Sequence, residues 1–424
     1  MPSSPPTPAL LEARSRKYAR IDYGLIALLL AANGALTILV ILQSSLYSVF
    51  VSSILLGLSY AIHLHSLTGF FKHPKARIVE FGSNQKIGRY QAGEIYLMMR
   101  ELLAPHNGKE QPRTYITFPK YDGAFVLNSL FFNFVKPLNA VYISQHLFQI
   151  LKPGEIKAIL AHELAHFYQY IRPLNRVRFA LMGLNALLPI YLSLDDGQIS
   201  FWIAIGIWII FSLIFNFSVN TWLARTSQDH EYLCDLAAAR RYGVLNVANG
   251  LLGVCKTAEV QAKLYKALLT RIRKDNTLSL KTLESLVLRC EQDIPVKALN
   301  SKQLNRLVDQ ILSGPATSEL RKRLTKEEQK TEEAEIQKLV DRLMLAYDFQ
   351  LLDWKRFDYV IPDGRLNSSE YERLARTLEA EPDSQLFDIA TDNILYTKDK
   401  SHPTVAQRIH FLEHARQDGS SISL

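Results

Sequence analysis

The chain has 424 residues, of which 48% are hydrophobic, and its formal net charge is +8. This length accommodates two or three domains, and no recognisable nucleic-acid-binding motif accompanies the positive charge, so nucleic acid is not expected as a partner. The three cysteines, Cys234, Cys255 and Cys290, form no CxxC pair, so we expect them to be reduced and structural.

The N-terminal part predicts two closely spaced membrane spans after a disordered basic lead over 1–20. No charged residue occurs in Tyr23–Leu42 or in Leu46–Leu64, and a helix of either length can cross a hydrocarbon core of about 30 Å. We therefore expect a transmembrane hairpin over 21–66. The alternatives are a cleaved signal peptide, which the immediate second apolar stretch disfavours, and a buried soluble hairpin.

The segment 72–172 predicts a core in which a helix, a small sheet and a second helix follow one another. The first helix is expected over Gln91–Leu103, and the second begins at Pro153, with an acidic residue in its first turn. The β-like segments between them are Thr114–Phe118, Ala124–Leu127 and Ala140–Ser144. A small β-sheet should therefore lie beside the second helix.

The second helix carries the sequence HELAH over 162–166. Because His162 and His166 are four residues apart, both imidazoles lie on one face and can bind one metal ion. Glu163 projects beside this face, where its carboxylate can take a proton from water while the histidines hold the metal. The alternative is a chance match on a solvated helix face. Against it, the helix carries apolar residues at helical spacing: Ile156, Ile159, Leu160 and Leu164.

Two further apolar stretches predict a second transmembrane hairpin over 177–223. Ile199–Leu223 is long and uncharged, whereas Val177–Leu194 contains Arg178, Asn185 and Pro189. The weaker stretch could instead be re-entrant or buried in protein.

The distribution of positive charge predicts the orientation of these spans. Both hairpin turns lack Lys and Arg, so the positive-inside rule places the termini and the histidine motif in the cytoplasm. We expect an integral multi-pass protein of a bacterial inner membrane, or of the endoplasmic reticulum in a eukaryote, with the lipid bilayer as a partner. The flanking charges are Arg14, Arg16, Lys17, Arg20, Lys72, Lys75, Arg77, Arg172, Arg176, Arg178 and Arg225.

The helix expected over 224–255 offers the third metal ligand. His230 and Glu231 compete for this role, because adjacent helical residues point about 100° apart and only one of them can face the metal. Glu231 is favoured because it shares its face with Asp235, which can hydrogen-bond a ligating imidazole. The remaining alternative is an ordinary acidic helix face.

The C-terminal part is expected to be helical and soluble. It divides into a helical insert over 256–381 and a segment over 382–424 that returns to the core around the histidine motif. The insert could act as a lid or as a docking domain.

These residues resemble a known family, the integral-membrane gluzincins that include the protease HtpX and the CaaX prenyl endopeptidases. The resemblance rests on the HExxH sequence at 162–166, on Glu231-xxx-Asp235 and on Ser401-His402-Pro403 followed by Arg408-Ile409. It implies that His402 and Arg408 contact the substrate or stabilise the oxyanion. The family's Asn-Ala-Phe edge strand appears here as Gly123-Ala124-Phe125, a departure that leaves substrate preference open.

The residues and the resemblance together predict a mainly α, multi-pass membrane, zincin-like metalloprotease. One Zn²⁺ would be held by His162, His166 and Glu231, and Glu163 would serve as the general base. An unfolded or membrane polypeptide would lie along an edge strand at Ala124, Phe125 and Val126, which suits membrane protein quality control.

Two other functions compete with this prediction. The first is an intramembrane site-two-type protease, with Asp196-Gly197 as the Asp-Gly element, but Glu155 and Lys157 make the motif helix costly to place in lipid. The second is a non-enzymatic membrane scaffold or holdase with a structural metal, which would require a fourth protein ligand.

Overall fold

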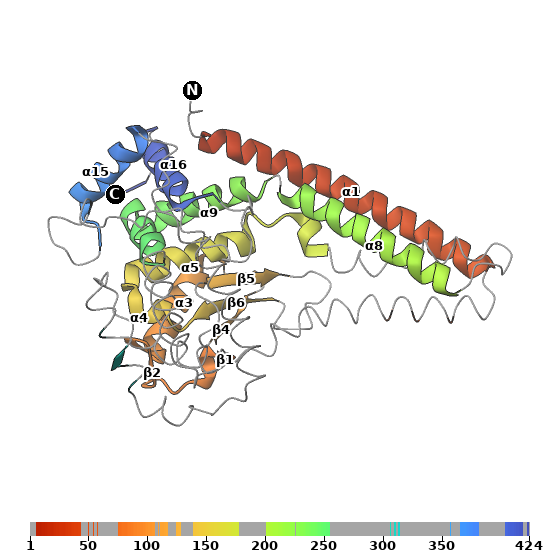
Figure 1. The fold of residues 1–424 in the computed structure, drawn as a ribbon. Coiled ribbons are helices and arrows are strands. Elements are labelled where there is room, and N and C mark those ends of the chain that lie inside the picture. Colours follow the sequence, from red (N-terminus) through yellow and green to blue (C-terminus); the bar gives the residue numbers. More distant parts are fainter. Residues whose placement is uncertain are drawn as a thin grey trace, which may run out of the picture.

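The computed structural model describes most of the chain outside the predicted insert. The described residues are 6–43, 75–106, 111–117, 124–128, 139–177, 201–224, 226–254, 365–380, 403–418 and 422–423, with single positions at 50, 54, 57, 109, 306, 309, 310, 313 and 357. A sheet and its covering helices form one body, and two long helices extend away from it side by side (Figure 1).

The main sheet has four strands in the order β1-β4-β6-β5. The strands are β1 (Lys75–Arg77), β4 (Arg113–Thr117), β5 (Ala124–Asn128) and β6 (Asn139–Ser144). β4 and β6 are parallel, while β1 and β5 pair antiparallel with their neighbours. Every residue of β6 is buried, as expected for a central strand. β5 therefore forms an edge of this sheet within the described part of the chain.

Short elements connect the sheet to the helices. A two-stranded hairpin, β2 (Lys86–Ile87) and β3 (Tyr90–Gln91), turns at Gly88, whose φ of 62° favours glycine. A Cβ at Gly88 would also lie 2.6 Å from the backbone of Phe148, so the hairpin can approach that segment closely. The remaining short elements are η1 (Ile78–Glu80), η2 (Ala104–His106) and α4 (Leu147–Ile150).

Helix α5 (Pro153–Tyr168) lies between the sheet and α9 (Ser227–Tyr242), as Figure 1 shows. It begins at Pro153, and the Glu155 carboxylate accepts a 2.7 Å hydrogen bond from the Lys152 N–H, which satisfies one free donor at the helix start. Its apolar residues Ile156, Leu160 and Leu164 share a buried cluster with the sheet residues Ile116, Val141 and Ile143 and with α3 (Ala92–Leu103). This packing fixes α5 on the sheet.

Helices α15 (Ser368–Ala380) and α16 (Val405–Gln417) cover α9 on the side away from the sheet. Thr404 and Gln407 exchange two hydrogen bonds that cap the start of α16, with distances of 3.2 and 2.9 Å. One buried cluster joins the three helices: Leu233 and Leu236 of α9, Tyr371 and Leu374 of α15, and Ile409, Phe411 and Leu412 of α16. Residues far apart in sequence thus pack around the part of α9 that carries Glu231, the expected third metal ligand.

The two long helices are α1 (Pro8–Gln43) and α8 (Phe201–Ala224). Both extend away from the sheet in the same direction (Figure 1). Near the sheet, Ile26 and Leu29 of α1 pack with α8 and with residues that follow α5; these partners are Leu174, Val177, Phe215, Val219, Trp222 and Leu223.

The predicted multi-pass membrane architecture is wrong. The chain is mainly helical with a small sheet beside α5, but no helix in the described ranges is both long enough and apolar enough to cross a membrane. Residues 8–20, expected to be a disordered lead, form the first turns of α1, so charged residues belong to this helix. Some apolar residues of α1 and α8, such as Ile26 and Phe215, are partly buried in one cluster, whereas others, such as Leu28 and Phe217, are exposed.

The predicted membrane location, and the bilayer as a partner, are corrected by the same finding. One of the charges used to orient the spans has another role, because Arg172 is 5% exposed and forms an ion pair with the buried Asp22. Residues 178–200, most of 44–74 and most of 256–381 lie outside the described residues. The domain boundaries therefore remain predictions.

Candidate metal centre

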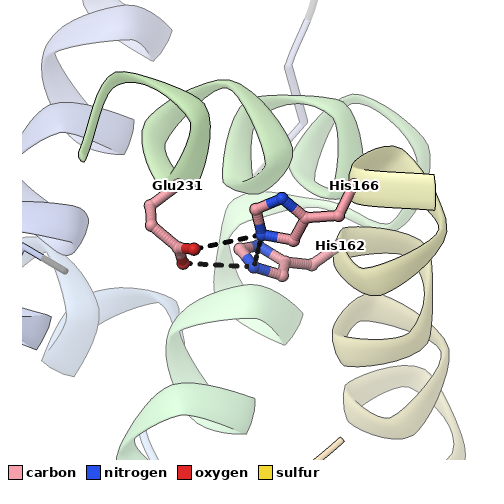
Figure 2. A group of neighbouring side chains, drawn as sticks. All are labelled: His162, His166 and Glu231. Carbon is pink, nitrogen blue, oxygen red and sulfur yellow. Dashed lines mark hydrogen bonds and ion pairs between the residues drawn. The ribbon is translucent and has the colours of Figure 1, made fainter. Parts of the chain in front are cut away.

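Three side chains from two helices converge on one point (Figure 2). His162 and His166 lie on one face of α5, and their Nε2 atoms are 3.1 Å apart. The carboxylate of Glu231 on α9 reaches both rings, at 3.3 Å from Nε2 of His162 and 3.1 Å from Nε2 of His166. These three residues form a group whose ligand atoms lie within 4.8 Å of one another.

The packing of α9 on α5 decides between the two candidates for the third position. Glu231 is 5% exposed and faces the histidines, whereas the ring of His230 points to α1, where its Nε2 lies 3.2 Å from Oγ of Ser15. Burial is the main cause that lowers the pKa of His230 to about 4, so this ring is neutral at ordinary pH. The structure thus brings Glu231, and not His230, to the histidine pair.

Asp235 lies behind His162, one turn along α9 from Glu231. Its Oδ1 is 2.9 Å from Nδ1 of His162, which leaves Nε2 of that ring directed at Glu231 and His166. Arg408 of α16 donates to both carboxylate oxygens of Asp235, each at 2.6 Å. A second carboxylate is also near this guanidinium, because Nη1 lies 3.8 Å from Oε2 of Glu231.

The charges in this cluster shift one another's pKa values. Burial opposes a charged His162 ring, but the adjacent carboxylates of Asp235 and Glu231 outweigh it and raise the pKa of His162 to about 10 in the metal-free site. Burial likewise opposes ionisation of Asp235, yet Arg408 and His162 lower its pKa below the usual value. The pKa of Arg408 is raised, because the carboxylates outweigh the desolvation of its guanidinium.

Glu163 lies on α5 beside the converging side chains and is half-buried. Burial is the main cause that raises its pKa, and the nearby charges of His162, His166 and Arg408 partly oppose this rise. A carboxylate whose pKa is raised is a better proton acceptor and can later return the proton. Its environment is therefore suited to general base chemistry.

The donor set fits a zinc ion. Two imidazole nitrogens and one carboxylate oxygen are the ligands of a catalytic zinc site that keeps one position open. No fourth His, Cys, Asp or Glu joins the group within the described residues. The buried Cys234 lies next to this site in sequence, and its thiol pKa is raised well above the usual value, mainly by burial, so a thiolate is disfavoured.

The predicted substrate-binding residues lie on the edge strand β5, which packs beside α5. Ala124 and Val126 contact the cluster under α5, while Phe125 points to the other face and stacks on Tyr142 with ring centroids 4.9 Å apart. The side chains alternate between the two faces of the sheet, as expected for a strand, so these three residues share no side-chain surface. What they have in common is the backbone edge of β5.

The remaining sequence-predicted residues divide into two groups. Arg408 is at the site, but its strongest contacts are with Asp235, a pairing that the sequence motif did not predict. His402 lies outside the described residues, as do Asp196 and Gly197 of the competing site-two hypothesis. The positive charge of Arg408 indicates that it needs an acidic partner, but the sequence offers several acidic residues and does not single out Asp235.

Comparison with known proteins agrees with this geometry. Residues 100–247 match the model of peptidase family M48. A protease HtpX homolog of Syntrophobacter fumaroxidans (strain DSM 10017 / MPOB) is 37% identical over 83 residues, which cover 19% of this chain and 27% of that protein. The chain thus matches about a quarter of that relative's length, and no solved structure matches it.

The family match includes both α5 and α9, the two helices that carry His162, His166 and Glu231. It covers the part of the chain in which the HExxH sequence and the third acidic residue were identified. The match to peptidase family M48 over 100–247 and the similarity to an HtpX homolog confirm the resemblance to HtpX-like metallopeptidases that the motifs predicted.

Proposed function

We propose that the chain is a zinc-dependent endopeptidase that hydrolyses peptide bonds in unfolded polypeptides. The observation that carries this proposal is the convergence of His162, His166 and Glu231 beside a half-buried Glu163. Peptidase family M48 supports the hydrolytic chemistry. Zinc, endopeptidase specificity and a role in quality control are the parts that experiment has to test.

In this proposal the two histidines and Glu231 hold the metal, and Asp235 orients His162 through Nδ1. When bound, Zn²⁺ supplies a Lewis acid that polarises a peptide carbonyl and lowers the pKa of water towards about 7. Arg408 balances the charge of Asp235, whose pKa is lowered despite its burial, and its Nη1 also lies 3.8 Å from the carboxylate of Glu231. His402 and Arg408 also remain the candidates for contacting the substrate carbonyl.

Glu163 performs the proton transfers. Its carboxylate accepts the proton of the attacking water and returns it to the nitrogen of the leaving amine when the C–N bond breaks. The raised pKa favours this double role, because a carboxylate that binds a proton more readily gains more from accepting it. No other acidic residue of α5 occupies the same place, since Glu155 is bound by Arg365 at the start of the helix.

The edge of β5 supports an extended polypeptide as the substrate. A peptide that pairs with the backbone around Ala124, Phe125 and Val126 gains main-chain hydrogen bonds that are largely independent of its sequence. Binding of this kind suits unfolded chains, whose backbone groups are free to pair, and it underlies the proposed role in quality control.

The decisive test replaces the proton carrier and leaves the ligands in place. Glu163→Gln should retain zinc, measured by atomic absorption, while casein cleavage falls by about 10²–10⁴-fold, the usual contribution of a general base. Glu372→Gln, at an exposed position of α15, is the matched control and should cleave like the wild type. Retained cleavage in purified Glu163→Gln would reject the assignment.

A further inference from the structure

One face of α1 meets the start of α9. Four residues at helical spacing lie on this face, and each of them packs with or contacts a residue of α9 or the nearby Arg172. Leu11 is buried in the cluster that contains Leu233, and Ser15 contacts His230. The other two residues, Tyr18 and Asp22, surround a single arginine, Arg172.

Arg172 and Asp22 form a buried ion pair. Asp22 has no exposed surface, and Arg172 is 5% exposed. The guanidinium donates to both carboxylate oxygens, with Nε at 2.7 Å from Oδ2 and Nη2 in close contact with Oδ1. Trp222 donates to Oδ1 at 2.9 Å, and its ring and that of Tyr18 lie 5.5 and 5.3 Å from the guanidinium carbon. Paired hydrogen bonds and aromatic faces hold this arginine in one orientation.

The same arginine reaches the start of the third-ligand helix. Nη1 of Arg172 donates to Oγ1 of Thr226 at 2.8 Å, and Thr226 is fully buried immediately before α9. The carbonyl of Thr226 in turn accepts the first helical hydrogen bond from the His230 N–H, at 3.1 Å. Arg172 itself lies four residues beyond the end of α5. One guanidinium thus connects the end of the histidine helix to the beginning of the Glu231 helix.

We propose that Asp22, Arg172 and Thr226, which we call the clamp, position Glu231 against the histidine pair. A zinc site requires its ligand atoms at fixed separations, and Glu231 is carried on a helix distant in sequence from α5. The clamp fixes the place where the end of α5 approaches the start of α9. Asp22 of α1 holds Arg172 in the orientation that reaches Thr226. The inference rests on the proposed metal site, and it adds α1, which lies outside the matched 100–247, to the residues on which that site depends.

The opposite end of α5 provides a matched control. There Arg365 donates to Glu155 at 2.8 Å and to the carbonyl of Ile150 at 2.9 Å, so this arginine also joins a distant segment to α5. It differs from the clamp in that neither of these two partners lies in α9 or at its start. A lysine in place of either arginine keeps the charge and removes the forked geometry.

The test compares Arg172→Lys and Thr226→Val with Arg365→Lys in the full-length chain. Cobalt(II) binding is followed through its visible absorption spectrum and by competition with a chelator, and hydrogen exchange is measured on the metal-free proteins. Both clamp variants should bind cobalt about tenfold more weakly and should show an altered spectrum. This loss is near the lower end of the loss in metal affinity that follows when a residue supporting a metal ligand is replaced. Their exchange should increase over 227–235, whereas Arg365→Lys should keep the wild-type spectrum and the wild-type exchange over 227–235.

Wild-type affinity, spectrum and exchange in Thr226→Val would overturn the clamp, and so would an equal loss of cobalt affinity in Arg365→Lys. Thr226→Val decides alone if Arg172→Lys does not fold, because it removes one acceptor and leaves the ion pair intact. Exchange over 227–235 needs no metal. A wild-type protein that bound no cobalt would therefore reject the proposed metal site, while exchange would still decide whether the clamp orders α9.

Discussion

Two arginines hold buried aspartates with paired hydrogen bonds, and they differ in how directly they reach the candidate metal site. Arg408 binds Asp235, whose Oδ1 lies 2.9 Å from the ring of His162. Arg172 binds Asp22 and reaches α9 only through the hydroxyl of Thr226. The first pair therefore acts on the charge and orientation of a ligand, and the second acts on where two helices meet.

This difference separates two ways in which a buried ion pair can support a site. Removing one partner of either pair leaves an uncompensated buried charge, so the loss of folding stability should be similar for both. Only the Asp235 pair touches a ligand ring, so the loss of metal affinity should differ between them. Stability and metal affinity measured together distinguish the two roles.

The largest effect is expected from Asp235→Asn. Loss of the carboxylate charge should lower the free energy of unfolding by about 3–5 kcal/mol and weaken zinc binding by about 10–100-fold. Asp22→Asn should lower stability by a similar amount, with a smaller loss of zinc affinity. Urea unfolding of the metal-free proteins and chelator competition measure the two quantities. Equal zinc affinities in the two variants would contradict the distinction between the pairs.

A smaller effect is expected from pH in the metal-free protein. The pKa of His162 is raised from 6.5 to about 10, so the stability that its protonated ring contributes is fully present below 6.5 and is lost as pH rises through about 10. The free energy of unfolding should therefore decrease across this window. Zinc affinity should change in the opposite direction, because the metal binds the neutral ring.

Asp235→Asn is the control for this pH dependence, because it removes the strongest of the interactions that raise the pKa of His162. The decrease in unfolding free energy between 6.5 and about 10 should be much shallower in this variant. His230, with a pKa lowered to about 4, is neutral in the folded protein across the window, and it adds only a small slope of opposite sign near 6.5, where its unfolded ring still titrates. A wild-type protein whose stability did not change with pH in this range would contradict the assigned charge on His162.

The smallest effect is expected from Ser15→Ala on α1. This change removes the hydroxyl that lies 3.2 Å from the His230 ring and should cost about 0.5–1.5 kcal/mol of stability. Cobalt affinity should stay within about twofold of the wild type, since the Asp22–Arg172 pair is retained. A loss of cobalt affinity in Ser15→Ala as large as that in Thr226→Val would mean that α1 supports α9 through Ser15 and not through the clamp.

The elements that depend on local sequence were predicted well. The helix that begins at Pro153 and the histidines on one of its faces follow from local residue preferences and helical spacing. The ends of strands β4, β5 and β6 differ by at most one residue from those expected. The predicted multi-pass architecture was wrong, because no helix in the described part of the chain is both long enough and apolar enough to cross a membrane.

Sequence alone determined the residue types of the candidate centre and the family in which they occur, since spacing of four along one helix is a local property. Only the tertiary structure decided that Glu231 and not His230 faces the histidines, and that Arg408 binds an aspartate 173 residues away in sequence. It likewise joined Asp22 to Arg172 across 150 residues. Such pairings depend on how helices pack, and helix packing arises from the burial of whole faces, which no short stretch of sequence specifies.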